Sequence, residues 1–326
     1  MDKEQKTITV QEIGEIIRRD FSRKYRRFAS VSYTHLVRRS MLFMPGNNPG
    51  MLLNADILGA DAAILDLEDA VSPAEKDAAR ILVRNAIKTL KYKCEVCVRI
   101  NSIDTTFWKE DLDEILPLRP DLIMPPKIST AQDVLVVDAY MTELEKKHGM
   151  EVGTVKLIPL IETALGIENA YAIASSCPRV AAMLLGGEDL TADLQCKRTK
   201  EGKEIFYSRS RMVVAARAAG VDCYDTPFTD VNDDEGLRAD AAFAKALGFT
   251  GKSSISPRHV ADINRIFSPT QADIEYAQEV METIRVAKEQ GKGVVSLRGK
   301  MIDAPIVTRA RQVLEMAKAM GVLIDE

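Results

Sequence analysis

The sequence is poor in histidine, which many catalytic centres require. It has only three histidines in 326 residues, His35, His148 and His259, and none of them ends an apolar run of the kind that forms a strand. Ser–His–Asp triads and most zinc sites depend on histidine. The scarcity therefore argues against either kind of centre.

Cysteine is scarce as well. The five cysteines are an odd number spread over a long chain, so we expect reduced thiols and no disulfide framework. Cys94 and Cys97 have CxxC spacing, but they stand in an apolar stretch without a second pair to complete a zinc site. Simple core packing is the favoured interpretation of both.

Long apolar runs are also missing. No run approaches the roughly 18 residues of a membrane span, and the N-terminus lacks the pattern of a secretory signal. These absences predict a cytoplasmic protein without a membrane partner. The formal net charge of −4 disfavours nucleic acid as a partner.

The N-terminal segment differs in charge from the rest of the chain. Residues 1–39 hold ten Lys or Arg and five Asp or Glu, a net charge of +5, which leaves −9 for the remainder. We interpret residues 1–37 as a basic extension, solvated or partly disordered, in preference to a segment that binds nucleic acid or a membrane.

From residue 40 onward, short apolar runs alternate with helical patterns, which is typical of βαβ units. The eight runs are "SMLFMP", "AAILDLE", "EVCVRIN", "DLIMPPK", "KLIPLIE", "AAMLLGGED", "VDCYDT" and "GKSSISP". Helical patterns between them include residues 73–90, 131–148, 209–220 and 233–248. Eight such units predict an α/β fold, a (β/α)8 TIM barrel over residues 38–267. An open doubly wound sheet is the alternative, although no GxGxxG follows the first run.

The remaining chain is too long for closure of a barrel. Residues 270–290 carry apolar residues at helical spacing behind a Thr270 cap, and a Gly-rich segment then leads into a last helix. We therefore predict that residues 268–326 form a C-terminal helical arm or lid.

Carboxylates at strand ends are the main chemical resource of this sequence. Glu162 closes the apolar run "KLIPLIE", and a buried carboxylate is costly without a partner. Asp189 ends the next run, so a shared Mg²⁺ or Mn²⁺ would compensate both acids. Two alternatives stay open: Asp189 caps a helix, or Glu162 pairs with a nearby Lys or Arg.

Arg99 would bring a guanidinium to the same end of the barrel, where it would bind a carboxylate or enolate oxygen. An ion pair with Asp66 or Glu68 is the equally weighted alternative. In "DLEDAV", Asp66 and Glu68 share one face of the strand, and such a density of acids favours a cation nearby, with these two supporting its ligands.

The turn "MPGNNPG" offers free backbone N–H groups to a carbonyl or anion, which makes Pro45, Gly46 and Asn47 candidate substrate contacts. Lys127 and Lys252 are possible Schiff-base formers, although such lysines more often bind an anionic group. Asp303, in "GKMIDAPIV", either caps the final helix or exchanges a proton with substrate from a lid.

Six ordered motifs together resemble the citrate lyase β-subunits of the HpcH/HpaI aldolase–citrate lyase family, which includes metal-dependent citryl, malyl and related acyl-CoA lyases. The resemblance runs from about residue 38 to the end. The motifs are "RRSMLFMPGNNPGMLLNADILGADAAILDLEDAV", "VRINSIDT", "IPLIETALGI", "LGGEDLTADL", "GFTGKSSISPRHV" and "GKMIDAPIV".

The resemblance implies a (β/α)8 barrel that is usually trimeric, with Mg²⁺ held by Glu162 and Asp189. It also implies a substrate-binding role for Arg99 and a catalytic role for Asp303, which would reach the site of a neighbouring subunit. The long arm of an acyl carrier would enter over the turn at 45–47 and Lys252.

The activity so implied is cleavage of a citryl thioester, on a carrier protein or CoA, to oxaloacetate and an acetyl thioester. Companion α subunits and acyl-carrier γ subunits are implied too. Three rivals remain: a malyl-CoA or citramalyl-CoA lyase, a Schiff-base aldolase, and a non-catalytic scaffold subunit of a lyase complex.

Overall fold

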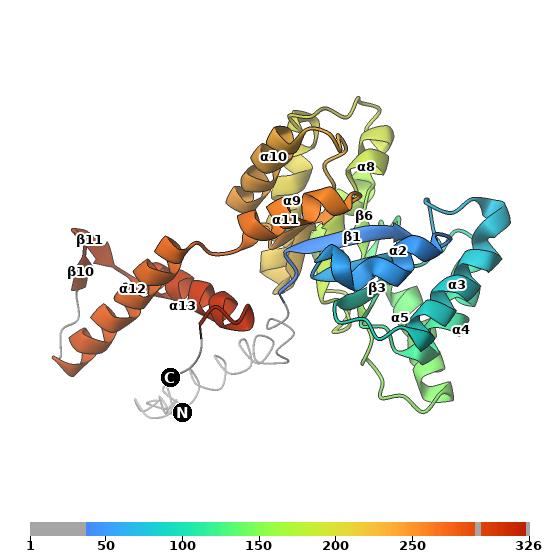
Figure 1. Cartoon of the computed structure of the whole chain (residues 1–326), viewed down its shortest axis with the longest axis horizontal. Coiled ribbons are helices and arrows are strands. Elements are labelled where there is room, and N and C mark those ends of the chain that lie inside the picture. The colour runs from blue at the N-terminus through green and yellow to red at the C-terminus, as the bar shows by residue number, and fades with distance from the viewer. Residues whose placement is uncertain (1–36, 291–294, 324–326) are drawn as a thin grey trace, which may run out of the picture. The chain divides into compact units, whose positions relative to one another are not determined.

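The computed structural model describes residues 37–290 and 295–323, so the predicted basic extension lies almost wholly outside the described residues. The described chain contains a nine-stranded parallel sheet (Figure 1). Its strands are β1 (Ser40–Pro45), β2 (Ala62–Asp66), β3 (Glu95–Arg99), β4 (Leu122–Met124), β5 (Lys156–Leu157), β6 (Leu160–Ile161), β7 (Ala182–Leu185), β8 (Asp222–Asp225) and β9 (Gly251–Ser254). Each of the eight predicted runs contributes to this sheet.

The sheet curls until its two ends meet in one segment. Its strand order is β5-β4-β3-β2-β1-β9-β8-β7-β6, and β5 and β6 are the two halves of residues 156–161, separated by Ile158 and Pro159. β5 pairs with β4 on one side, while β6 pairs with β7 on the other. The ladder therefore returns to its starting segment with eight strand positions, which confirms the (β/α)8 prediction over the open doubly wound alternative.

Successive residues of each strand face opposite sides of the sheet, as the two-residue period of a strand requires. One set forms a cluster that contains no helix residue and fills the interior of the curled sheet: Met41, Ala62, Ile64, Cys97, Leu122, Met124, Ile158, Leu160, Ala182, Leu184 and Tyr224. The other set packs against the helices. Because both faces of the sheet are buried, the strand sequences are nearly continuous apolar runs.

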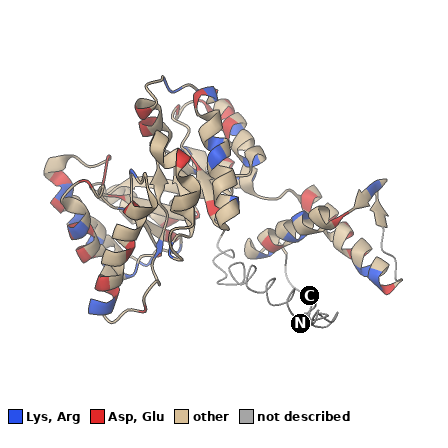
Figure 2. Ribbon diagram, turned by 180° about the vertical axis from the view of Figure 1, so that it is seen from behind, with Lys and Arg blue, Asp and Glu red and all other residues tan. Residues whose placement is uncertain are grey.

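Helices follow the strands, and charged residues are spread along them (Figure 2). They are α2 (Pro49–Asn54), α3 (Lys76–Thr89), α4 (Phe107–Ile115), α5 (Ala131–Lys147), α6 (Ala164–Glu168), α7 (Ala170–Ala174), α8 (Gly187–Asp193), α9 (Phe206–Ala219), α10 (Asp234–Leu247) and α11 (Pro257–Phe267). The predicted helices at 73–90, 131–148, 209–220 and 233–248 are confirmed as α3, α5, α9 and α10. None of the helices in the described ranges is long and apolar enough to cross a membrane.

The C-terminal segment forms α12 (Gln271–Glu289), the hairpin of β10 (Val295–Leu297) and β11 (Lys300–Ile302), and α13 (Ala304–Ala319). Thr270 and Asp273 form a capping box at the start of α12, as the Thr270 prediction required. Ala277, Val280, Ile302 and Ala310 are the buried centre of a small separate core. The predicted C-terminal helices are thus present.

Candidate functional site

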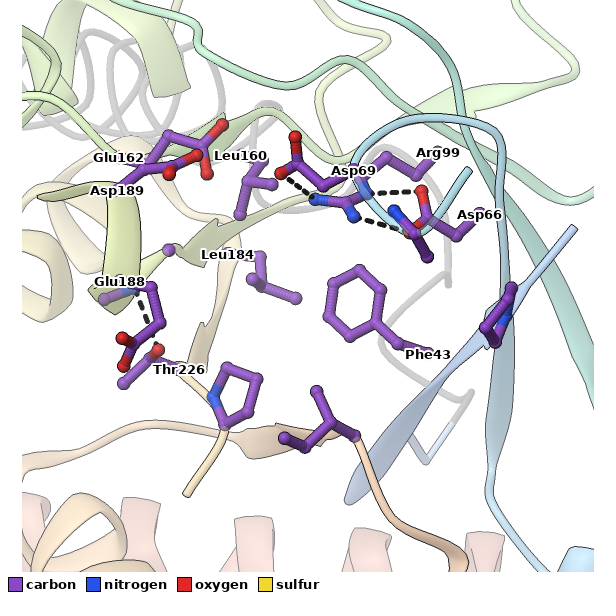
Figure 3. Close-up of a pocket in the computed structure, with 16 residues that line it drawn as sticks. Phe43, Asp66, Asp69, Arg99, Leu160, Glu162, Leu184, Glu188, Asp189 and Thr226 are labelled. Carbon is purple, nitrogen blue, oxygen red and sulfur yellow. Dashed lines mark hydrogen bonds and ion pairs between the residues drawn. The ribbon is translucent and has the colours of Figure 1, made fainter. Parts of the chain in front are cut away.

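A cavity of about 430 Å³ opens at the carboxyl ends of the strands (Figure 3). Most of the residues that line it belong to the inward-facing set of strand positions or stand two positions further along the chain. Asp66 stands two positions after Ile64, Arg99 after Cys97, Glu162 after Leu160, Gly186 after Leu184 and Thr226 after Tyr224. The two-residue period therefore aims these side chains at one point. Other lining residues are Phe43, Pro45, Asp69, Ala70, Gly187, Glu188, Asp189, Pro227 and Ile255.

Glu162 lies deep in this cavity with only 3% of its surface exposed. Its Oε1 accepts a hydrogen bond of 2.7 Å from the backbone N–H of Lys127. Gly186 makes room for the other oxygen, because a Cβ on Gly186 would stand 2.5 Å from Glu162 Oε2. Within the described part of the chain, no lysine or arginine forms an ion pair with Glu162. The predicted alternative of such a pair is therefore absent there.

Asp189 lies beside Glu162 but belongs to a helix, because β7 ends at Leu185 and Gly186 caps α8. It occupies the first turn of α8, so it is not the cap that one interpretation expected. Burial, together with the negative charges of Asp189 and Glu68, raises the pKa of Glu162 to about 8. The two acids thus concentrate negative charge at one point, and among the described residues the one basic side chain paired with either of them is Lys127, whose Nζ lies 3.9 Å from Asp189.

These two acids fit a hard divalent cation. Magnesium commonly takes one or two protein carboxylates and completes its shell with water and substrate oxygens. Among the residues described, no group of three or more His, Cys, Asp or Glu could enclose a metal ion. The chemistry of the donor set, two carboxylates facing an open cavity, suits Mg²⁺ or Mn²⁺ with exchangeable positions and does not suit a closed structural site.

Arg99 also lines the cavity, in a fixed orientation. Its Nε and Nη2 donate to the two oxygens of Asp66 at 2.7 and 2.5 Å, and its guanidinium lies 5.0 Å above the ring of Phe43. Nη1 is 3.0 Å from Glu68 and 3.4 Å from Asp69. The ion pairs that sequence analysis weighed for Arg99 are present, and they aim one edge of the guanidinium at the exposed carboxylate of Asp69.

Lys127 is a site residue whose position sequence analysis missed. In a regular parallel ladder, the residue two positions after Pro125 would donate to Leu160 O; here Ile128 donates instead, so one extra residue is inserted. That extra residue is Lys127, with a left-handed φ of 56° that costs a non-glycine residue about 1 kcal/mol. The bulge frees the N–H of Lys127 for Glu162. The double proline before it was the available signal.

Lys252 lies outside the cavity, contrary to its predicted substrate contact. It is fully buried on β9, and its Nζ donates at 2.6 Å to Asp225, Asp240 and the carbonyl of Thr226. The register explains this position, because Lys252 is paired with Ser40 and faces the helices, whereas the next residue is paired with inward-facing Met41. A lysine whose Nζ already makes three hydrogen bonds is also a poor Schiff-base nucleophile.

The turn after β1 brings only part of its predicted contacts to the cavity. Pro45 lines the cavity, but Gly46 donates its N–H to Asp66 O at 2.8 Å and has no room for a side chain. Asn47 donates to Glu75 at 2.9 Å. Gly46 therefore allows β1 and β2 to approach closely and does not offer the free N–H that the prediction required.

Asp303 is the exposed N-cap of α13, where it accepts a hydrogen bond of 3.1 Å from Ile306 N. It does not line the cavity of its own chain. The capping prediction is confirmed, and a role in a neighbouring subunit stays a prediction.

Comparison with known proteins identifies the family of this chain. The family described as HpcH/HpaI aldolase/citrate lyase matches residues 39–257. The chain is 45% identical to citrate lyase subunit beta of Haemophilus influenzae over 87% of this chain and 98% of that protein. It is 43% identical to citrate lyase subunit beta of Leuconostoc mesenteroides subsp. cremoris, over 89% and 96% respectively.

A crystal structure of CitE from Mycobacterium tuberculosis in complex with magnesium, acetoacetate and coenzyme A is also similar. It has a TM-score of 0.70 and 28% identity, and the match covers 87% of this chain and 99% of that chain. Fold, motifs and matched length agree, and the chain belongs to the HpcH/HpaI aldolase/citrate lyase family.

Proposed function

We propose that this protein is a magnesium-dependent carbon–carbon lyase that cleaves a citryl thioester into oxaloacetate and an acetyl thioester. One observation carries the proposal: Glu162 is a buried acid beside Asp189, without an ion-pair partner among the described residues, in a cavity that also presents a fixed arginine. The identity with two citrate lyase beta subunits supports the substrate. Magnesium in CitE of Mycobacterium tuberculosis supports the metal.

Glu162 and Asp189 would hold the cation, and the substrate would bind beside them in the cavity. When bound, the ion supplies Lewis-acid chemistry that eases loss of the hydroxyl proton. The bond between the hydroxyl-bearing carbon and the methylene carbon next to the thioester then breaks. The first carbon becomes the ketone of oxaloacetate, and the methylene carbon gains a proton to give the acetyl thioester.

Arg99 stabilises the negative charge in this cleavage. Asp66 holds two of its nitrogens, so the guanidinium needs no reorientation when charge develops. A substrate carboxylate or the thioester enolate would replace Asp69 at Nη1. Asp66 and Glu68 act by positioning Arg99 and Lys127. Asp303 of a neighbouring copy is the candidate for the proton transfer.

The decisive test replaces Glu162 with Gln, which keeps the shape and removes the charge. Turnover of a citryl thioester should fall about 10³-fold, about 4 kcal/mol in transition-state stabilisation. Glu143→Gln, an exposed change on α5, is the matched control. Wild-type turnover in Glu162→Gln would overturn the role of Glu162 in the reaction, whereas no turnover of a citryl thioester by the wild-type protein would favour the scaffold alternative.

A panel of thioesters separates the remaining rivals. Citryl carrier protein and citryl-CoA should be cleaved faster than malyl-CoA or citramalyl-CoA, and activity should vanish in EDTA and return with Mg²⁺ or Mn²⁺. Preference for malyl-CoA would defeat the substrate choice. Activity retained in EDTA, with borohydride trapping of Lys127 or Lys252, would favour a Schiff-base aldolase.

The wider setting follows from the same proposal. We infer a cytoplasmic complex with α subunits and acyl-carrier γ subunits, built on a homotrimer or larger oligomer. In this arrangement residues 38–267 are the catalytic domain, residues 268–326 are the arm that brings Asp303 to a neighbour, and residues 1–37 are an appended extension.

A further inference from the structure

We propose that Lys127 is a built-in counter-ion of the acidic site formed by Glu68, Asp69, Glu162 and Asp189. Its ammonium group occupies this site in the metal-free protein and competes with the divalent cation. The inference rests on the metal of the proposed function and adds a residue that sets the affinity for that metal.

The geometry of Lys127 carries the inference. Its Nζ lies 2.7 Å from Glu68, 3.6 Å from Asp69 and 3.9 Å from Asp189, while its backbone N–H binds Glu162. One residue therefore touches all four acids on this side of the cavity, including both proposed metal ligands. The bulge and the left-handed backbone of Lys127 make this double contact possible.

The ammonium group cannot hold its place unchanged once a cation binds. A divalent ion between Glu162 and Asp189 would stand within a few ångströms of Nζ, where like charges repel strongly. The side chain of Lys127 is 38% exposed and has a flexible stem, so it is free to withdraw into solvent. Arg99, which Asp66 holds by two hydrogen bonds, has no such freedom. Lys127 is thus the mobile charge, and Arg99 is the fixed one.

The first experiment is calorimetric titration of metal-free protein with MgCl₂, without substrate. Lys127→Met removes the charge and keeps an unbranched side chain, and we expect it to bind Mg²⁺ on the order of tenfold more tightly than wild type. Lys127→Arg keeps the charge and should bind like wild type. The matched control is Lys88→Met, an exposed change in α3. Unchanged or weaker binding by Lys127→Met would overturn the inference. Tighter binding is diagnostic because a merely damaged site would lose affinity.

The second experiment needs no variant that must fold. Reductive methylation of wild-type protein, read out by mass spectrometry, should label Lys127 several-fold faster in Mg²⁺ than in EDTA, while the rate at Lys88 stays constant. Equal rates at Lys127 would overturn the displacement.

Glu162→Gln separates failure of this inference from failure of the proposed function. If Glu162→Gln abolishes Mg²⁺ binding while Lys127→Met leaves the affinity unchanged, only the counter-ion inference fails. If Glu162→Gln binds Mg²⁺ like wild type, the proposed metal site fails, and the counter-ion role of Lys127 fails with it.

Discussion

Two clusters of charged side chains lie around the same strand ends and differ in the balance of acids and bases. The first joins Arg209 of α9, Asp225 of β8, Asp240 of α10 and Lys252 of β9 through ion pairs of 2.6–2.9 Å. Its two acids and two bases cancel, and all four side chains are at most 7% exposed. None of the four lines the cavity.

The second cluster faces the cavity and does not balance. It contains the acids Asp66, Glu68, Asp69, Glu162 and Asp189 against the bases Arg99 and Lys127. Counted as fully ionised, five acids and two bases leave −3. Part of this excess is relieved by the raised pKa of Glu162, which favours the protonated form in the metal-free protein.

The difference separates structural charge from functional charge. A balanced, closed cluster satisfies itself and leaves nothing for a ligand, whereas an unbalanced cluster beside a cavity is stable only with a proton or a cation. The register decides which residue joins which cluster, because outward-facing strand positions supply the first and inward-facing positions the second.

The largest effect should come from unbalancing the closed cluster. Lys252→Met leaves Asp225 and Asp240 to share Arg209, and we expect the free energy of unfolding to fall by about 3–5 kcal/mol. Urea denaturation measures this loss. The exposed change Lys88→Met should stay within about 0.5 kcal/mol of wild type. A loss below about 1 kcal/mol for Lys252→Met would break the comparison.

An intermediate effect should come from crowding the open cluster. In Gly186→Ala the new methyl would collide with Glu162, so we expect a loss of about 1–3 kcal/mol in stability. Weaker Mg²⁺ binding should accompany it in calorimetry. Gly50→Ala is the control for both measurements, because its nearest neighbour would lie 3.4 Å away. Wild-type Mg²⁺ affinity in Gly186→Ala would show that the position of Glu162 does not control the metal.

The smallest effect is the pH dependence of the metal-free protein. The pKa of Glu162 is near 8 when folded and near its ordinary value of 4.5 when unfolded, so unfolding releases a proton between these values. Stability in EDTA should therefore fall as pH rises from 6.5 to 7.5, by about 1 kcal/mol or less from this group.

Thermal unfolding of wild type and Glu162→Gln across that pH range isolates the contribution. The variant should lack this part of the slope, and Mg²⁺ should remove it from wild type, because the cation stabilises the ionised carboxylate. An identical slope in both proteins would place the titrating group elsewhere.

Particular residues show how far the sequence led. The two-residue period and the polar strand ends were enough to predict the strands and to select Glu162, Arg99 and Asp66, because alternation along a strand is local. The same reasoning misplaced Lys252. The side of the sheet on which Lys252 lies depends on the register of β9 with β1, which cannot be deduced from the sequence of β9 alone. It also extended the sixth predicted run, which contains β7, to Asp189, because Gly186 and Gly187 give no apolar period to mark the start of α8.

The sequence by itself determined the alternation of strands and helices and the gathering of acids at the strand ends, because side-chain period and composition are local properties. Only the tertiary structure decided which charges cancel. It set Lys252 among the helices and inserted Lys127 as a bulge against Glu162, because ion pairing depends on register and curvature across residues far apart in the chain.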